Sequence, residues 1–450
     1  MQLGSAMNTT IKSQSAAATR RQTYLDHLLT QAKAAADESG LGLKPLRERA
    51  AALASDRTFP HSKQEEWRFT DLSDLLDLPL ERSHPVTPSP SVTHNVALIE
   101  SSLRLATVNG HYDQTLSATD KKIRGVAVAP LSVLLRNPAY SQKIGEAIAS
   151  KLAQIQGGSE VFTALNTAGF SDVMVVWVSA DTVVDEPICI ARGSQSSSIS
   201  HLRTLVIAER HAQFTLLESF WGDDEQARCN NSVTEIWLDE GAQVNHIRLQ
   251  DEGAQTFHLA KSAIAQAAHS RYHCTAIDLG AQLSRHHLEV YQTGPQTDTH
   301  LYGLSALSAQ QLADTHSLLM LAHPHGTATQ LQKNVVDNRA HGVFNGKVYV
   351  SQNAQLTNAS QLNRNLLLSN QARVDTKPEL DIVADDVKCA HGATVSQLQA
   401  DEVFYLQSRG ISAAQAQRLL LYGFAMEIVE KISVEAVKKM LGDRISAWAK

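Results

Sequence analysis

The second half of the chain is dominated by a regular alternation of apolar and polar residues. From Asp172 onward this alternation has a period of two, which is typical of β-strands. The run from Val173 to Val178 predicts a buried strand, and similar runs follow at residues 202–207, 214–217, 233–238, 244–249, 272–277 and 287–291. The stretch from Phe344 to Leu398 continues the pattern with short strands separated by small polar corners. Strands at this spacing favour stacked coils over the hairpins of one flat sheet.

Short corners of similar sequence recur between these strands. They are Arg210-His211-Ala212-Gln213, Gly241-Ala242-Gln243, Gly280-Ala281-Gln282 and Asn353-Ala354-Gln355. A weak internal repeat of this kind is expected when each coil of a solenoid turns at the same place, so we predict a β-helix. The spacings are irregular, which indicates coils of variable length. A β-sandwich is the alternative, because strand spacing alone does not separate the two folds.

Helical periodicity precedes the β region. Apolar residues at helical spacing predict a helix over residues 19–36, whereas residues 1–18 are expected to be frayed. A second helix is predicted from Pro45 to Ser55. Trp67 and Phe69 are expected to anchor the next segment on a domain surface.

Helical periodicity also follows the β region. Residues 401–408 predict one helix, and Ser412 to Gln415 form a capping-box signature that opens the next. The apolar face of that helix is predicted to contain Leu419, Leu420, Phe424, Ile428 and Val429. A last helix is predicted to begin near Ser433. These helices either pack on the β core or offer a docking surface to another subunit.

The chain is therefore predicted to be mainly β, with a β-helix core flanked by helical domains. Pro79, Pro85, Pro88 and Pro90 mark a linker. We place an N-terminal helical domain with this linker at 1–95, a mixed α/β connecting region at 96–171, the β-helix at 172–398 and a C-terminal helical domain at 399–450.

Composition excludes several classes of protein. The 450 residues are 43% hydrophobic and 19% charged, as in ordinary globular proteins. A net charge of −6 without a long basic run argues against nucleic-acid binding. We expect no membrane association, because no run of about 18 apolar residues occurs. The polar start up to Thr23 does not resemble a signal peptide, so the expected compartment is the reducing cytoplasm.

The four cysteines, Cys189, Cys229, Cys274 and Cys389, are far apart in the sequence. This spacing excludes a local zinc knuckle or ferredoxin motif, and it does not resemble a disulfide framework. The first three lie beside apolar strand residues and are expected in the core, with persulfide handling as a remote alternative.

Cys389 and His391 are the candidate metal ligands. Residues i and i+2 of a strand share a face, so a thiol and an imidazole would lie together. These two ligands suit iron, zinc or copper, but a closed site usually needs four. The others would come from elsewhere in the chain or from a partner. Otherwise no metal binds, and Cys389 is a packing residue with His391 at a corner.

Other clusters of chemistry-bearing residues carry weaker signals. His323 and His325 could bind a metal, but a solvent-exposed loop is the simpler interpretation. His286 and His287 are predicted to point to opposite faces of a strand. Asp385 and Asp386 are the pair that a carbohydrate-active β-helix enzyme would require, yet adjacent strand residues also face opposite ways. A metal-free homodimeric structural protein is a further alternative.

Four segments resemble the SufB/SufD family of SUF-system iron–sulfur cluster assembly scaffold proteins: Gly346–Asn370, Asp385–Val395, Phe404–Ile411 and Lys63–Leu72. The sequences KCAHGATV and EEWRFTDL resemble the SufD branch. The cysteine cluster typical of the SufB branch is missing from the N-terminal half.

The resemblance implies a right-handed parallel β-helix between helical domains. It implies a non-catalytic subunit that pairs with SufB through the β-helix and docks the SufC ATPase through the C-terminal helices, around Phe404 to Phe424. ATP-driven closure of two SufC subunits would rearrange the SufB–SufD interface. The chain has no Walker A pattern, so we do not expect it to hydrolyse ATP itself.

The resemblance also places Cys389 and His391 at the SufB interface, with His391 the stronger candidate for an iron ligand. They would hold a nascent iron–sulfur cluster transiently and share it with the partner. We expect no catalytic residue, no cofactor in the isolated chain, and a possible homodimer when SufB is absent.

Overall fold

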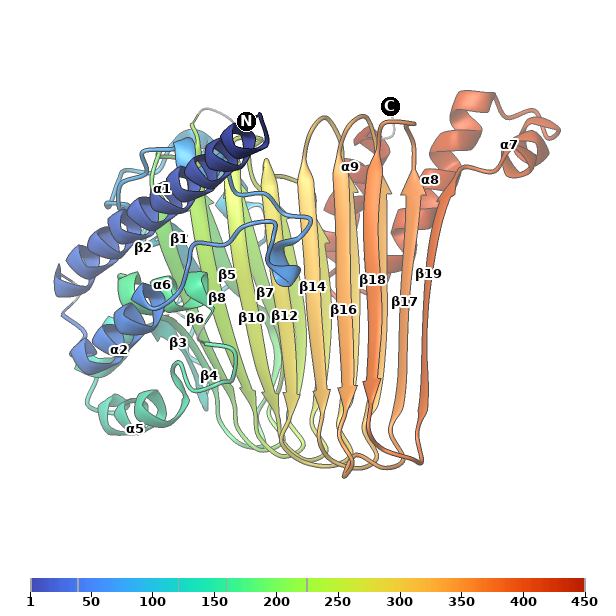
Figure 1. Ribbon diagram of the computed structural model, residues 1–450. Helices are drawn as coiled ribbons and strands as arrows, with labels where there is room; N and C mark the ends of the chain where they lie inside the picture. Colours follow the sequence, from blue (N-terminus) through green and yellow to red (C-terminus); the bar gives the residue numbers. More distant parts are fainter. Residues whose placement is uncertain (1, 39, 120, 159, 224–225, 449–450) are drawn as a thin grey trace.

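The computed structural model describes residues 2–38, 40–119, 121–158, 160–223 and 226–448. The chain is mainly β, and its core is a β-solenoid of about 8 turns with helices at both ends (Figure 1). Within the coils, each strand pairs in parallel with the strand two positions later in the chain, so two sheets face each other. The predicted β-helix is therefore confirmed, and the β-sandwich alternative is wrong.

The strands alternate between the two sheets. Sheet A consists of β3 (Val126–Pro130), β4 (Met174–Val178), β6 (Ile199–Ala208), β8 (Arg228–Leu238), β10 (Thr256–Gln266), β12 (Leu283–Gln292), β14 (Leu312–Leu321), β16 (His341–Val350) and β18 (Arg373–Ile382). Sheet B consists of β1 (Arg104–Val108), β2 (His111–Tyr112), β5 (Val183–Ser194), β7 (Gln213–Gly222), β9 (Gln243–Asp251), β11 (Arg271–Asp278), β13 (Asp298–Leu307), β15 (Thr327–Val336), β17 (Asn358–Leu367) and β19 (Lys388–Gln397). The sheets thus extend back to Arg104, because β1 pairs in parallel with β5.

Successive coils turn from sheet A to sheet B through a residue in the left-handed conformation. These residues, with φ of 56–68°, are Asp181, His211, Gly241, His269, Gln296, His325 and Leu356. Each donates its backbone N–H to a carbonyl of the following coil, with N···O distances of 2.7–3.1 Å. The corners therefore form a hydrogen-bonded stack of their own, which fixes where every coil begins again.

The recurring corners predicted from the sequence belong to two different turns. Ala212 and Ala242 follow the left-handed residue of the turn from sheet A to sheet B and are fully buried. Ala281 is itself left-handed, with φ of 72°, and lies in the opposite turn, between β11 and β12. The recurring corners therefore indicated a solenoid correctly. They combined two different turns, however, one from sheet A to sheet B and one from sheet B to sheet A.

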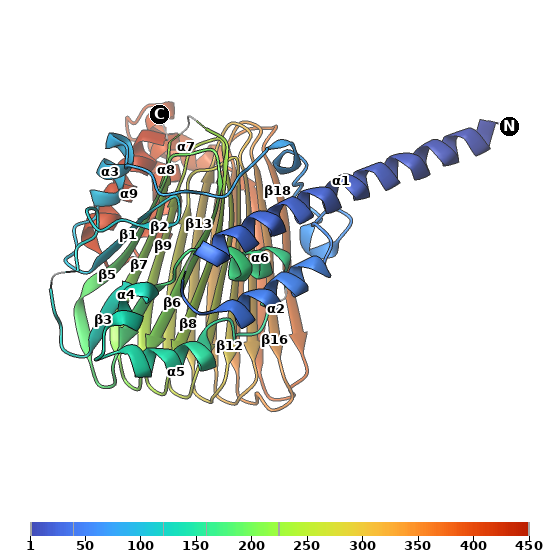
Figure 2. The same cartoon turned by 90° about the vertical axis from the view of Figure 1, so that its left-hand side faces the viewer.

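Helices flank the two sheets. They are α1 (Gln2–Glu38), α2 (Lys44–Ser55), α3 (Pro90–Ala97), α4 (Leu131–Arg136), α5 (Ser141–Lys151), α6 (Val161–Gly169), α7 (Ala400–Gln407), α8 (Ala413–Val429) and α9 (Glu435–Trp448). Two short 3₁₀ turns lie at Glu65–Trp67 and Leu75–Asp77. Helices α1, α2 and α6 lie over sheet A, whereas α8 and α9 pack on sheet B (Figures 1 and 2). Among the described residues, no helix has both the length and the apolar character needed to cross a membrane.

Two helical predictions need correction. The first helix begins at Gln2 and not near Thr19, and Figure 2 shows it projecting well beyond the β-helix. In α8 the capping box of Ser412 and Gln415 is present as predicted. Its buried face, however, contains Ala416, Leu421, Ala425, Ile428 and Val429, while Leu419 is 51% exposed. The face of α8 that packs on sheet B therefore differs in part from the face predicted from its periodicity.

The N-terminal segment is fastened to sheet A by a buried ion pair. Arg285 of β12 pairs with Asp314 of β14, and its guanidinium lies 4.0 Å from the centroid of the buried Trp67 ring. Thr70 also donates a hydrogen bond to Asp314, and Arg285 donates one to the Glu66 carbonyl at 2.8 Å. Trp67 is thus an anchor as predicted, whereas Phe69 is only half-buried.

We expect Asp314→Asn to lower the free energy of unfolding by about 3–5 kcal/mol, because it leaves the buried Arg285 charge unpaired. Urea unfolding followed by circular dichroism at pH 7 measures this. Lys377→Ala, which breaks an exposed ion pair with Glu65, is the control and should have a much smaller effect. Equal effects of the two substitutions would contradict the anchoring role.

The same comparison has a pH dependence. Burial alone would raise the pKa of Asp314, but the charge of Arg285 outweighs it and holds the pKa below its ordinary value of 3.8. The stability contributed by this carboxylate is complete above that value and is lost as the pH falls. The difference between the wild type and Asp314→Asn should therefore shrink on acidification below about pH 5.

Candidate functional site

The β-helix ends at β18 and β19 without a further coil to cover them. β19 pairs only with β17, and β18 only with β16, so each is the terminal strand of its sheet (Figure 1). Their outer edges therefore present unpaired backbone N–H and C=O groups, which can accept a further strand. We call this face, made by β18 and β19, the open end.

Cys389 and His391 lie at the open end on the face of β19 that continues the interior of the β-helix. Cys389 is in register with Ala359, and His391 with Gln361, and both of these β17 residues are buried. Cys389 is half-buried against the core, whereas His391 is exposed because nothing stacks on it. The two predicted ligands thus share a face, and neither is enclosed in a dry interior.

A column of buried amides leads up to His391. The Gln361 side chain donates a hydrogen bond to the Gln330 side chain at 2.9 Å, one coil below. A Cβ added at Gly346 would lie 2.3 Å from the Gln361 amide nitrogen, so a larger residue there would displace the Gln361 side chain. The Gln361 side-chain oxygen is buried and has no hydrogen-bond partner among the described residues. The end of the column is therefore polar, with this buried acceptor beneath an exposed imidazole.

Apolar side chains surround this polar column. Leu380 of β18 packs against the end of the core, while Ile382 and Val395 are exposed. The open end therefore combines unpaired strand edges, exposed apolar residues, one thiol and one imidazole. This combination is typical of a surface that another β-structure covers.

The other three thiols are buried, as the sequence predicted. Burial raises the pKa of Cys189 to about 11, and it raises that of Cys229 further. Burial also raises the pKa of the half-buried Cys389 thiol. Cys389 is therefore protonated at neutral pH, and a metal that binds it must displace the proton.

Among the described residues, the remaining sequence candidates form no metal-ligating cluster with Cys389 and His391. The His286 ring lies 3.0 Å from the Ser262 hydroxyl inside the β-helix, whereas His287 points outward, 3.3 Å from Glu289. They face opposite ways, as predicted. Asp385 and Asp386 lie in the exposed corner before β19, not on a strand, and Gln352 donates a hydrogen bond to Asp385. This corner does not form the paired-carboxylate groove of a glycosidase.

Large apolar side chains are exposed on the C-terminal helices. Phe404 and Tyr405 of α7 are 69% and 57% exposed, and Leu419 and Tyr422 of α8 are also exposed. We call these four residues the α7–α8 surface. The exposure of Leu419 was not predicted, because helical periodicity indicates an apolar face but not which element covers it.

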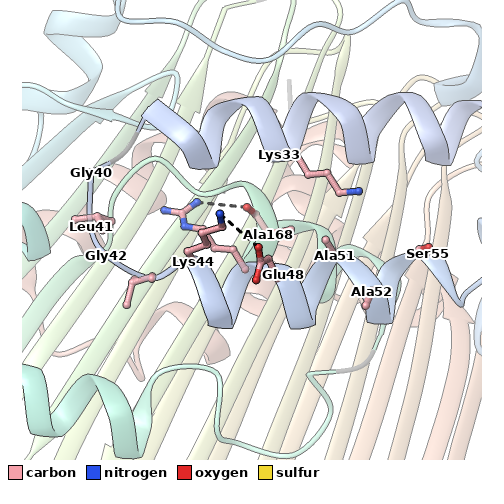
Figure 3. A pocket seen from close by; sticks show the side chains of 12 residues that line it. Lys33, Gly40, Leu41, Gly42, Lys44, Glu48, Ala51, Ala52, Ser55 and Ala168 are labelled. Atoms are coloured by element: carbon pink, nitrogen blue, oxygen red, sulfur yellow. Dashed lines mark hydrogen bonds and ion pairs between the residues drawn. The ribbon is translucent and has the colours of Figure 1, made fainter.

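A pocket of about 620 Å³ lies between α1 and α2, away from the open end (Figure 3). Two of its cationic groups, Lys44 and Arg47, have protein partners. Lys44 pairs with Glu48 at 3.8 Å, and Arg47 donates hydrogen bonds to the carbonyls of Ala168 and Phe170. The hydrogen bonds of Arg47 tie α2 to the C-terminal end of α6.

Comparison with known proteins gives a consistent result over most of the chain. Residues 190–424 match the family model described as SUF system FeS cluster assembly, SufBD core domain, and residues 18–190 match the SufBD protein N-terminal region. An iron–sulfur cluster assembly SufBD family protein of Synechocystis sp. is 42% identical over 94% of this chain and 96% of its own length. The chloroplastic protein ABCI7 of Arabidopsis thaliana is 31% identical over 90% and 85%. The iron–sulfur cluster assembly protein SufD of Escherichia coli is 28% identical over 86% and 88%.

We expect a thiol-reactive disulfide reagent to modify one cysteine of the native chain, Cys389, because the other three are buried. Since the pKa of Cys389 is raised above 9.0, the rate should keep increasing as the pH rises beyond that value. Absorbance of the released thiolate measures the stoichiometry and rate. The Cys389→Ser variant should release none before unfolding. Labelling of Cys189, Cys229 or Cys274 in the native state would contradict the burial described above.

Proposed function

The chain belongs to the SufBD family of SUF-system iron–sulfur cluster assembly proteins, and we propose that it is a non-catalytic scaffold subunit on whose open end a cluster is built. The cluster is the cargo of this scaffold and not a resident cofactor. Its partners in the proposal are a SufB subunit at the open end and a SufC ATPase at the α7–α8 surface.

The observation that carries this proposal is the position of Cys389 and His391 on the uncovered last coil. Two ligands are too few to hold an iron–sulfur cluster, which usually takes four. A second β-helix that adds its strands to the free edges of β18 and β19 would bring its own ligands to the same place. The open end therefore supplies half of a site and the means of recruiting the other half.

The two side chains suit different tasks in such a shared site. His391 is exposed and is a ligand without rearrangement, because an uncharged imidazole binds iron directly. Cys389 is half-buried and protonated, so its coordination requires loss of a proton and a small movement of the strand edge. A cluster held by these two groups would be released readily when the partner subunit moves, as a transient assembly site requires.

The α7–α8 surface supports the second part of the proposal. Aromatic side chains exposed on a short helical appendage are expensive to leave in water and are enriched at protein interfaces. Lys333 of β15 binds the Phe424 carbonyl at 2.9 Å and pairs with Glu427, so α8 is firmly fixed to sheet B. A partner that moves the α7–α8 surface would therefore transmit force to the last coils.

We expect His391→Ala to abolish cluster formation when the chain is mixed with SufB, SufC, iron and sulfide under anaerobic conditions. The visible absorption of the cluster measures the loss, and gel filtration should show an intact complex. Lys388→Ala is the matched control, because Lys388 lies on the same strand with its side chain on the other face. Cluster formation at the wild-type rate in His391→Ala would refute the ligand role.

We expect Phe404→Ala to weaken the binding of SufC by at least about fivefold, because truncating an interface aromatic at a hot spot costs more than about 1 kcal/mol. Titration calorimetry measures the affinity. Val183→Ala is the control, because Val183 is 58% exposed on β5, near the other end of the β-helix. Equal affinities of the two variants would show that SufC docks elsewhere.

If the open end serves a metal-free homodimer instead, the chain would dimerise through β18 and β19 and would not exchange one copy for SufB. Gel filtration of an equimolar mixture separates this outcome from the proposed heterodimer.

A further inference from the structure

A second group of metal-ligating side chains lies on the outer face of sheet B, away from the open end. His273 of β11 is in register with His300 of β13, and Asp298 precedes His300 by two residues on the same face. The His300 Nε2 atom lies 3.1 Å from one Asp298 oxygen, and the His273 Nε2 atom lies 3.5 Å from the other. One ligand atom from each residue lies within 4.8 Å of the other two.

These spacings match a coordination shell. Zinc bonds to nitrogen and oxygen are about 2.0–2.2 Å long, so two ligand atoms of a tetrahedral site lie about 3.3 Å apart. The two imidazole rings are also suitably arranged, with centroids 4.5 Å apart and an interplanar angle of 78°. Rings that are nearly perpendicular can direct both Nε2 atoms to one point without stacking.

The surroundings orient the ligands further. The Tyr302 hydroxyl lies 3.0 Å from the Nδ1 atom of His300, where it can accept the other ring proton, as outer-shell groups of metal-binding histidines do. The His273 Nε2 atom is buried and has no hydrogen-bond partner among the described residues. Buried polar atoms usually have a partner, and among the described residues this nitrogen has a carboxylate nearby but no hydrogen bond to it. A bound metal ion would supply the partner.

The carboxylate is ready for a cation. Asp298 lies between the two imidazoles, with one carboxylate oxygen toward each ring. Two nearby cations also need consideration. Arg271 is the register neighbour of Asp298 on β11, and Lys431 lies over the Tyr302 ring at 5.3 Å. Among the described residues, neither Arg271 nor Lys431 lies within 4.0 Å of an Asp298 oxygen as an ion pair. The two carboxylate oxygens therefore face the two imidazoles.

We propose that His273, Asp298 and His300 bind one divalent transition-metal ion of the zinc and ferrous class, with water completing the shell. Two imidazole nitrogens and one carboxylate favour Zn²⁺ or Fe²⁺ over Ca²⁺ and Mg²⁺, which prefer oxygen ligands, and over Cu⁺, which prefers sulfur. The three residues are half-exposed, so an ion can enter from solvent. This site is independent of the cluster ligands at the open end.

The ion would join two neighbouring coils beside the attachment of the C-terminal helices. Asn245 is in register with His273 on the next strand, and it donates a hydrogen bond to Ser433, between α8 and α9, at 2.6 Å. Metal binding here therefore stiffens the part of sheet B on which α8 and α9 rest.

The test is a titration of the metal-free full chain with Zn²⁺, followed by calorimetry, and with Co²⁺, followed by its visible d–d absorption. We expect one equivalent of either ion to bind. His300→Ala and Asp298→Asn should each weaken Zn²⁺ binding by at least about tenfold, and circular dichroism should confirm that both variants are folded. Asp298→Asn preserves side-chain size and tests the charge alone. Zn²⁺ should also raise the thermal midpoint of the wild type but not of the variants.

Two controls distinguish this site from others. His325→Asn removes an imidazole from the corner before β15, where Asn tolerates the left-handed conformation, and should bind Zn²⁺ like the wild type. His391→Ala should also bind like the wild type. Absence of Zn²⁺ binding by the wild type, unchanged binding by Asp298→Asn, or loss of binding in His391→Ala would each overturn the proposal.

Discussion

The whole structure depends on the backbone hydrogen bonds between successive coils. Parallel pairing fixes residues of one coil directly above those of the last, so side chains 26–32 residues apart in the sequence become neighbours. This constraint creates the buried amide column beneath His391 and brings His273 beside His300. It also leaves the strand edges of the last coil unpaired, because no further coil follows it. The proposed cluster site lies at these unpaired edges.

The same constraint explains why the interior tolerates charge. Glu218 is buried inside the β-helix and accepts hydrogen bonds from Thr204 and Thr234, while His246 lies 3.1 Å away. Burial alone would lower the pKa of His246, but its bonds to Cys274 and Glu218 raise it to about 9, so it pairs as a cation with Glu218. A buried pair of this kind is stable only in one register, since slipping a coil by one residue would turn these side chains outward.

Much of the fold could be predicted because its determinants are local. Alternation, the small corners and the capping box at Ser412 each involve a few consecutive residues, and each gave the correct element. The shared face of Cys389 and His391 follows from the same local rule. The extent of α1 was underestimated because residues 1–18 are rich in Ser, Thr, Ala and Gln, a composition that predicted a frayed end. The exposure of Leu419 depends on how α8 meets sheet B. The proximity of His273, Asp298 and His300 depends on the length of the coil between them. This length could not be read from the sequence, because the corners are irregularly spaced.

Because the left-handed corners stack regularly, the number of coils sets the length of the β-helix. Neighbouring strands of a sheet are about 4.8 Å apart, so about 8 turns set a span of roughly 38 Å between the N-terminal helices and the last coil. Gain or loss of one complete coil during evolution would change this span by one strand spacing. It would leave the chemistry of the terminal coil unchanged. The geometry of an assembly built on such a protein can therefore be adjusted in fixed steps by duplicating or deleting one repeat.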